Sequence, residues 1–555
     1  MLNLTKYTSF SYQKLMNRKD FISRFKKIKK LILNLPLHPF LFAVFPLLSF
    51  YSFNIKELTL NVLLTPVVIV VITTALLLLI LSFLLKNRNK ANMFVALFVL
   101  LFFSYGHIHN IIGELNYTVG GFYIGTDKTL IPIFAVLLLL GAYFLIKTRS
   151  HFQRLTSLLN IIAILLVTVS LVNIGLYEFN TDRVSQLAEN ETKKVPSSSA
   201  NINLEKPDDP PDIYYIIFDR YASNSTLKEF FNYDNTEFTD YLTNKGFYVA
   251  TESTANYPKT HLSLASSLNF KHLTYLTSKV GKNASNQKPI FELIENNEVW
   301  RSLKSIGYKF VYLGNWWDPT RKNKYADMNF NYFKTGLDAE FGTKFLETTA
   351  LKPVINKIIK KLTWDHKVVS SHLYTFNKLK EMPEVKGPKF VYTHMLFPHD
   401  PYLLDQNCQR LSEKIEIGDE REKEAYINQL VCANKKIKEM VDEILSKSEI
   451  EPIIILQSDE GPFIHPEFKG RPGLGIDWTK LSVEALNTHI QILNAFYLPN
   501  VDKKVLYPSV TPVNTFRLIF NLYFKTNLDL LPDKNYITKD ADHPYYFIEV
   551  TDKLK

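Results

Sequence analysis

The chain has 555 residues, a formal net charge of +11 and a hydrophobic fraction of 46%. This length allows more than one domain, because single hydrophobic cores stop growing at roughly 250–300 residues. The positive charge does not indicate a nucleic-acid-binding protein, because the excess is local: residues 14–30 are rich in Lys and Arg and contain a single Asp. A basic run directly before an apolar segment is typical of a cytoplasmic membrane anchor, so residues 1–34 are predicted to be a basic cytoplasmic N-terminus.

Five apolar stretches follow, each near the roughly 20 residues that a helix needs to cross a bilayer. They cover residues 35–53, 60–85, 93–112, 130–146 and 155–177. None has the short apolar region and small-residue cleavage site of a signal peptide. The sequence therefore predicts a transmembrane domain of five helices over residues 35–177.

The connectors between these stretches predict their orientation. "KNRNK" (86–90) and "KTRSHFQR" (147–154) are basic, whereas the other two connectors contain one Lys each. Basic connectors stay in the cytoplasm, so the N-terminus is predicted to lie inside. After five crossings, everything beyond residue 177 is predicted to lie outside the cytoplasmic membrane.

Residues 178–211 are polar, rich in Ser and Asn, and end in prolines, which predicts a flexible linker. An extracytoplasmic domain is predicted to follow over residues 212–555. It contains the only two cysteines of the chain, Cys408 and Cys432. Export permits a disulfide between them, and the alternative is two buried free thiols.

Short apolar runs alternate with helical patterns through this domain. The runs include "IYYIIF" (213–218), "KFVYTHM" (389–395) and "IIILQ" (453–457), and the helical patterns include "THLSLASSLNFKHL" (260–273) and "EAYINQLVCANKKIKEMVDEIL" (424–445). The runs show no polar alternation, which is typical of strands buried on both faces. The sequence therefore predicts an α/β domain with a mostly parallel sheet between helices.

Polar side chains follow several of these strands where each one ends. Asp219 follows the first strand, His394 and His399 belong to "THMLFPHD", and Asp459 and Glu460 follow the last run. Ligands bind at the carboxyl edge of such sheets, and carboxylates with imidazoles suit a divalent metal ion. The alternatives are solvated loop carboxylates and, for His394, a hydrogen-bonded core histidine.

Four motifs in order carry a resemblance to a known family: "PDIYYIIFDRYAS", "STANYPKTHLSLASSLN", "FVYTHMLFPHDPY" and "IIILQSDEGP". The chain resembles the alkaline phosphatase superfamily, in particular its membrane-anchored sulfatase-like hydrolase/transferase branch, which includes lipoteichoic acid synthases and the phosphoglycerol and phosphoethanolamine transferases. The likeness covers nearly the whole chain, because lipoteichoic acid synthases also pair five membrane spans with an external catalytic domain. It implies an alkaline-phosphatase-like fold and phosphoryl-group hydrolysis or transfer at the cell envelope.

The resemblance also implies site residues. Asp219 and Asp459 are similar to the family's metal ligands, and Glu460 stands where the family has His. The expected cofactor is one divalent metal ion, Mn, Mg, Ca or Zn, because a carboxylate can replace an imidazole as a ligand. His399, in "PHDPY", is similar to a catalytic, substrate-contacting histidine, and His394 is a second substrate-binding candidate on the same edge.

The nucleophile departs from the family's pattern. Asn256 occupies the nucleophile's position, where an amide can bind substrate but cannot attack phosphorus. The nearest hydroxyl at the start of the following helix is that of Thr260, and Thr254 in the preceding loop is a second choice. Thr260 is equally suited to cap this helix. No Cys lies here, so the formylglycine sulfatase mechanism is not expected.

The expected reaction is attack by the Thr260 hydroxyl on the head group of a membrane phospholipid donor. The phosphorylated Thr would pass its group to a cell-surface glycan or to water, and no nucleic acid is expected as a partner. The alternative is a catalytically silent membrane protein that binds a glycan, a lipid or a partner, which Asn256 and Glu460 favour.

Overall fold

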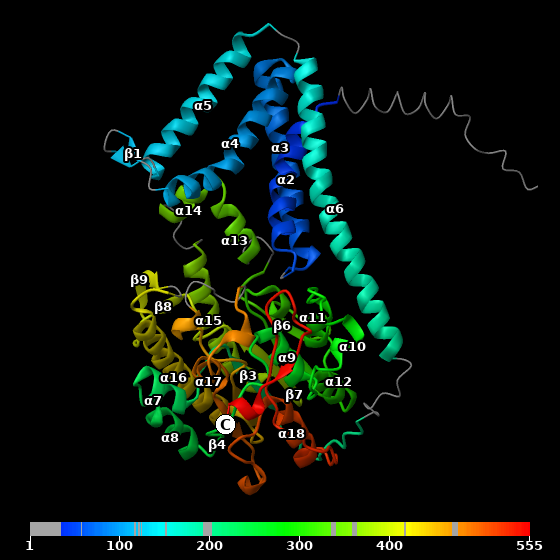
Figure 1. Cartoon of the computed structure of the whole chain (residues 1–555), viewed down its shortest axis with the longest axis vertical. Coiled ribbons are helices and arrows are strands. Elements are labelled where there is room, and N and C mark those ends of the chain that lie inside the picture. The colour runs from blue at the N-terminus through cyan, green and yellow to red at the C-terminus, as the bar shows by residue number, and fades with distance from the viewer. Residues whose placement is uncertain are drawn as a thin grey trace, which may run out of the picture. The chain divides into compact units, whose positions relative to one another are not determined.

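The computed structural model describes residues 35–554 apart from 57, 116–117, 120–121, 124, 150–151, 193–201, 335–339, 358–362, 416–417 and 469–474. The chain divides into two compact units (Figure 1). The first contains the N-terminal helices and residues 344–358, and the second contains most of residues 177–555. The predicted basic N-terminus, 1–34, lies outside the described residues.

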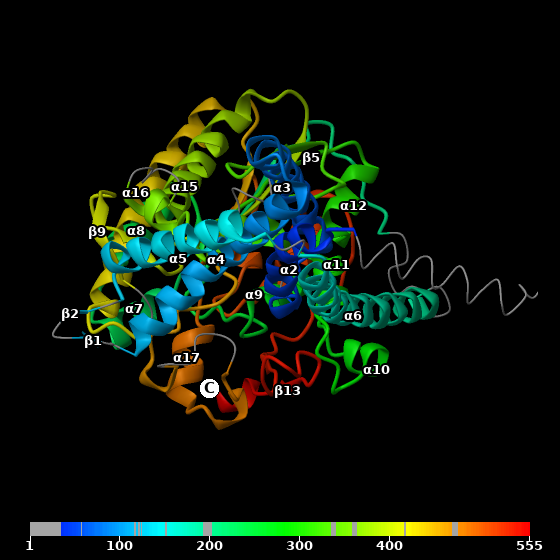
Figure 2. The same cartoon turned by 90° about the horizontal axis from the view of Figure 1, so that it is seen from above.

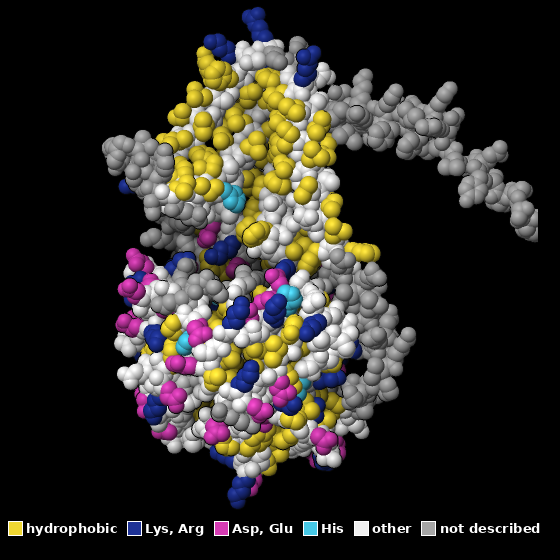
Figure 3. Space-filling view, viewed as in Figure 1, with side chains coloured by type: hydrophobic (Ala, Val, Ile, Leu, Met, Phe, Trp, Pro, Cys, Tyr) yellow, Lys and Arg dark blue, Asp and Glu magenta, His cyan; other side chains and the backbone are white. Residues whose placement is uncertain are grey.

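In the described part of the chain, four helices are long and apolar enough to cross a membrane. They are α3 (Leu64–Leu85), α4 (Arg88–Glu114), α5 (Asp127–Lys147) and α6 (Gln153–Thr192). Large apolar side chains such as Leu79 and Phe83 are exposed on these helices. Figure 3 shows that apolar side chains predominate among those coloured by type over the N-terminal helices. Such a surface is stable in contact with lipid and unfavourable in water. The predicted membrane region is confirmed for these four helices.

The first predicted span forms a shorter helix, α2 (His38–Phe53), with 16 residues. At 1.5 Å per residue it is about 24 Å long, below the roughly 30 Å of a hydrocarbon core. Phe42 and Ala43 of α2 pack against Val95 and Val99 of α4. A fifth crossing therefore stays a prediction.

Helix α6 extends further than the sequence predicted. It continues to Thr192, so the first part of the predicted linker, 178–211, is helical. Residues 178–192 contain neither Gly nor Pro, and their Glu, Gln, Leu and Ala residues favour a helix. Residues 193–201 of the linker lie outside the described residues.

A seven-stranded sheet forms the centre of the second unit, in the order β4-β11-β10-β3-β7-β5-β6. Its strands are β3 (Ile213–Phe218), β4 (Tyr248–Val249), β5 (Lys309–Leu313), β6 (Met328–Phe330), β7 (Lys389–Met395), β10 (Ile453–Gln457) and β11 (Asn494–Tyr497). Five neighbouring strands, from β10 to β6, are parallel, as predicted. The sheet is mixed, because β11 runs antiparallel to both β10 and β4.

Helices cover both faces of this sheet (Figures 1 and 2). Tyr215 of β3 faces a core formed with α9 (Thr260–Leu268), α11 (Lys288–Glu295), α12 (Glu298–Ser305) and α18 (Thr515–Tyr523). Tyr214 faces the opposite core, formed with α7 (Asn224–Phe231), α8 (Thr236–Asn244), α15 (Trp364–Glu381) and α16 (Glu422–Lys447). Burial on both faces explains why the central strands show no polar alternation.

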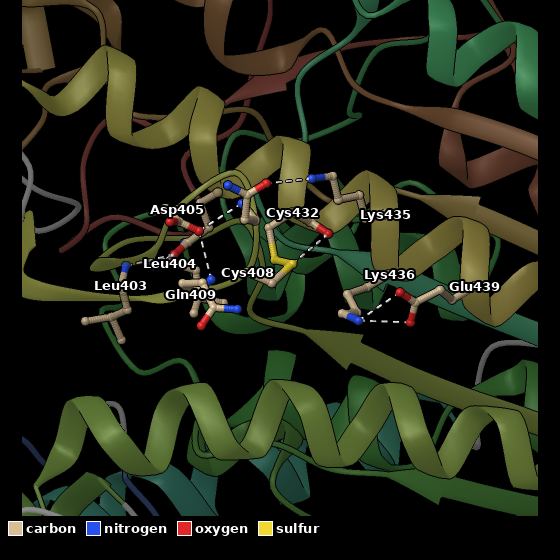
Figure 4. The surroundings of a disulfide bond; sticks show 11 residues. Leu403, Leu404, Asp405, Cys408, Gln409, Cys432, Lys435, Lys436 and Glu439 are labelled. Carbon is tan, nitrogen blue, oxygen red and sulfur yellow. Dashed lines mark hydrogen bonds and ion pairs between the residues drawn. A yellow bond between two sulfur atoms is a disulfide. The ribbon is translucent and has the colours of Figure 1, made fainter.

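A disulfide joins Cys408 to Cys432, as Figure 4 shows. The two Cα atoms are 5.1 Å apart, and the bond closes a loop with a sequence separation of 24. It ties the hairpin β8–β9 (Tyr402–Leu404 and Arg410–Ile415) to α16.

We expect the double variant Cys408→Ser, Cys432→Ala to lower the free energy of unfolding of the second unit by about 3 kcal/mol, because the crosslink restricts the unfolded chain. The thermal midpoint of the detergent-solubilised chain should fall by several degrees. A reducing agent should shift the wild-type protein similarly and leave the variant unchanged. An identical midpoint for the two proteins would contradict the prediction.

Candidate functional site

Three central strands bring the predicted polar residues to one edge of the sheet. Strands β10, β3 and β7 are neighbours, and Ile217 of β3 pairs with both Gln457 and His394. Asp219 directly follows β3, and Asp459 comes two residues after β10. Because parallel strands end at the same edge, Asp219, His394 and Asp459 meet there.

Asp219, His394 and Asp459 form a group in which one ligand atom of each lies within 4.8 Å of the others. The Nε2 atom of His394 is 3.4 Å from Oδ2 of Asp219 and 3.6 Å from Oδ2 of Asp459. Among the described residues, Oδ1 of Asp219, both carboxylate oxygens of Asp459 and Nε2 of His394 are buried without a hydrogen-bond partner. Buried carboxylates in this arrangement are unfavourable unless a cation neutralises them, so the donor set fits a divalent metal ion.

The charges of this group act on one another. Burial, and then the charge of Asp459, raises the pKa of Asp219. Burial lowers the pKa of His394, but Asp219 and Asp459 outweigh this effect and raise it to about 9. The backbone of His394 is held in place because Asn315 Nδ2 donates a hydrogen bond of 2.7 Å to its carbonyl oxygen.

Glu460, predicted as a metal ligand, lies outside this three-residue group. Its Oε1 is 3.7 Å from Nε of Arg220, and its Oε2 is 3.9 Å from Nε2 of His489. Asp459 and Glu460 are consecutive in the chain, but of the two only Asp459 belongs to the group. His394, predicted to bind substrate, is the third residue of this candidate metal group.

A cavity of about 320 Å³ opens beside this group, at the same edge of the sheet. Asp219 belongs both to the metal group and to the cavity wall. The other polar residues that line it include Arg220, Lys259, Thr260, His399, Asp400 and Glu460, and its aromatic wall consists of Trp316, Trp317 and Phe463. The structure thus brings Asp219, Thr260, His399 and Glu460 to one cavity.

Thr260 lies at the start of α9 but does not cap it. The N-cap residue is Lys259, without a side-chain capping bond, and Thr260 is the first helical residue. Thr260 lines the cavity, where the positive end of the helix dipole stabilises negative charge. The cavity position suits a nucleophilic hydroxyl.

His399 lines the cavity from the loop after β7. Its Nδ1 contacts the carbonyl oxygen of Asp400, so Nδ1 carries the hydrogen and Nε2 is left as an acceptor. Burial, and then the charge of Arg220, holds the pKa of His399 well below its usual range. The ring is therefore neutral at neutral pH.

Asn256 and Thr254 lie apart from the residues that line the cavity. The buried Asn256 amide donates to Thr511 Oγ1 at 3.0 Å and to the Lys534 carbonyl oxygen at 2.9 Å, and its oxygen accepts from the backbone N–H of Val513. Thr254 accepts a hydrogen bond from Asn535. These bonds tie the loop before α9 to the C-terminal segment of the chain.

Sequence reasoning missed several residues of the cavity wall. Arg220 directly follows Asp219, and Lys259 directly precedes Thr260. Their positions next to candidate site residues could have identified them as residues of the cavity wall. Trp316 and Trp317 follow the end of β5, which lies at the same sheet edge. That placement could have marked them as lining residues.

No protein-family model matches the chain, and no curated protein matches it significantly. Among solved structures, the C-terminal periplasmic domain of EcEptC from Escherichia coli is 13% identical with a TM-score of 0.41, covering 62% of this chain and 94% of that one. The same domain is also known in complex with zinc. The integral membrane protein lipooligosaccharide phosphoethanolamine transferase A from Neisseria meningitidis is 12% identical with a TM-score of 0.36, covering 89% and 95% of the two chains. The C-terminal periplasmic domain of phosphoethanolamine transferase EptC from Campylobacter jejuni is 12% identical with a TM-score of 0.35, covering 60% and 94%.

Proposed function

We propose that this chain is a membrane-bound, metal-dependent hydrolase or transferase that acts on phosphodiesters of phospholipid head groups or cell-surface glycans. One observation carries the proposal. Donor atoms of Asp219, His394 and Asp459, buried without a hydrogen-bond partner among the described residues, converge beside a cavity that Thr260 also lines.

The donor set favours certain metals. Two carboxylates and one imidazole suit Zn²⁺ or Mn²⁺ better than Mg²⁺ or Ca²⁺, which prefer oxygen ligands alone. When bound, the ion would lower the pKa of a nearby hydroxyl and neutralise charge that develops on the phosphoryl group.

The protein's own side chains would carry the bond changes. The Thr260 oxygen forms a bond to phosphorus while the bond from phosphorus to the leaving oxygen breaks. Nε2 of His399 accepts the hydroxyl proton and returns it to the leaving oxygen. An acceptor hydroxyl or water then attacks the phosphorylated Thr260, which regains its proton.

The membrane unit supports the proposed location. Residues of the two basic connectors lie together, since Lys90, Lys147 and Arg149 line one pocket. Basic connectors mark the cytoplasmic side, so α6, which begins at the end of the second of them, would lead the following domain outside. The disulfide fits an oxidising compartment. Anchoring would keep the site near a lipid donor and an envelope glycan acceptor.

The proposal predicts a metal-dependent phosphodiesterase activity in the purified, detergent-solubilised full chain. Turnover of a chromogenic phosphodiester should disappear after chelation and return when one equivalent of Zn²⁺ or Mn²⁺ is added. Bound metal is counted by elemental mass spectrometry on the same samples. A chain with neither metal nor turnover would instead support a silent protein that binds a glycan, a lipid or a partner.

A further inference from the structure

Arg220 lies directly after the metal candidate Asp219 and has a positive φ of 65°. This left-handed conformation is uncommon for a residue other than Gly and is often found at functional sites. A residue of α16 holds the backbone at Arg220, because Tyr426 Oη donates a 2.9 Å hydrogen bond to the Arg220 carbonyl oxygen. The Arg220 side chain lines the cavity and is only 11% exposed, and its guanidinium carbon lies 4.6 Å from the ring centre of Phe463.

The guanidinium of Arg220 has more donors than the protein uses. One terminal N–H group donates to Asp400, with which Arg220 forms an ion pair. Its Nε is 3.7 Å from Glu460, too far for a hydrogen bond, and is buried without a hydrogen-bond partner among the described residues. A guanidinium carries five N–H donors in a planar fork that matches the oxygens of a phosphoryl group.

An anionic substrate needs positive charge in this cavity, because acidic side chains line it. The acidic side chains that line the cavity would repel a phosphoryl group, and they are those of Asp219, Glu340, Asp400, Glu460 and Asp540. The Arg and Lys side chains that line it are those of Arg220 and Lys259, and both lie against the ring of Phe463.

We propose that Arg220 binds the phosphoryl oxygens of the substrate and that Glu460 serves as its counter-ion, not as a metal ligand. The role of Glu460 explains why a carboxylate stands where the family has a metal-binding His. It faces the guanidinium, while His394 supplies the imidazole of the metal group. This inference rests on the proposed phosphoryl chemistry of the same site.

Binding of inorganic phosphate to the metal-loaded full chain tests this role without turnover. We expect Arg220→Gln to weaken phosphate binding at least tenfold, measured by isothermal titration calorimetry, with bound metal unchanged. The Arg220→Lys variant keeps the charge but loses the planar fork, so it should weaken phosphate binding less than Arg220→Gln does. It replaces the Gln variant in this test if that variant does not fold. Phosphate affinity equal to wild type in a folded, metal-loaded Arg220→Gln variant would overturn the proposal.

Arg321 provides a matched control. Its side chain is also 11% exposed and pairs with a carboxylate, Asp318, at 3.2 Å, but it does not line the cavity. Arg321→Gln should leave phosphate affinity unchanged. A loss equal to that of Arg220→Gln would mean that the effect is not specific to the cavity, and would also overturn the proposal.

The Glu460→Gln variant distinguishes a counter-ion of Arg220 from a metal ligand, because the two roles predict opposite changes in phosphate affinity. Removing a counter-ion adds one positive charge to the cavity, so phosphate should bind several-fold more tightly and the metal should stay. A metal ligand would behave oppositely, with loss of metal and weaker phosphate binding, and that result would overturn the inference. Intact phosphate binding in a wild-type chain that turns over no phosphodiester would contradict the proposed function alone.

Discussion

The Asp459→Asn variant is expected to lose its divalent metal ion and at least about 10³-fold of its phosphodiester turnover, because a metal supplies several kcal/mol of transition-state stabilisation. Both oxygens of Asp459 are buried without a hydrogen-bond partner among the described residues. An amide at this position has no charge to offer and turns an N–H₂ group toward the cation. Bound metal is measured by elemental mass spectrometry after purification, and turnover is measured on the same preparation.

The matched control for this variant is Asp318→Asn. The Asp318 side chain is 7% exposed and pairs with Arg321, outside the metal group. The control should retain its metal and should still be stabilised against heat when Zn²⁺ or Mn²⁺ is added, as ligand binding to the folded state requires. An Asp459→Asn protein that keeps one equivalent of metal would contradict the proposed ligand set.

The Thr260→Ala variant is expected to lose at least about 10³-fold of its turnover, because it lacks the oxygen that attacks phosphorus. Thr260→Ser keeps that oxygen and should retain most of the activity. Folding should survive both changes, since Thr260 is not the N-cap residue of α9 and Ala favours a helix. Turnover is measured with the chromogenic phosphodiester.

A second measurement separates a covalent role of Thr260 from a binding role. Wild-type protein quenched during turnover should carry a phosphoryl adduct on the peptide that contains Thr260, detected by mass spectrometry. Thr254→Ala is the control, because the Thr254 hydroxyl is hydrogen-bonded to Asn535 outside the cavity. Unchanged turnover in Thr260→Ala would remove this residue from the mechanism.

The membrane region and the strands could be predicted because their signals are local. A bilayer-length apolar run such as α3 and a strand buried on both faces such as β3 are visible in consecutive residues. The direction of β11 is not local in this sense, because a strand's sequence does not specify whether its neighbour runs parallel or antiparallel. The 16-residue length of α2 likewise emerged only in the structure.

The same distinction between local and non-local information applies to the residues of the site. Sequence alone determined that Asp219, His394, His399 and Asp459 lie at one edge of a sheet, because parallel strands share their carboxyl ends. Only the tertiary structure decided that His394 joins the two aspartates and that Glu460 faces Arg220. The direction of a side chain after a strand depends on the loop conformation and on charges from distant segments, neither of which appears in the neighbouring residues.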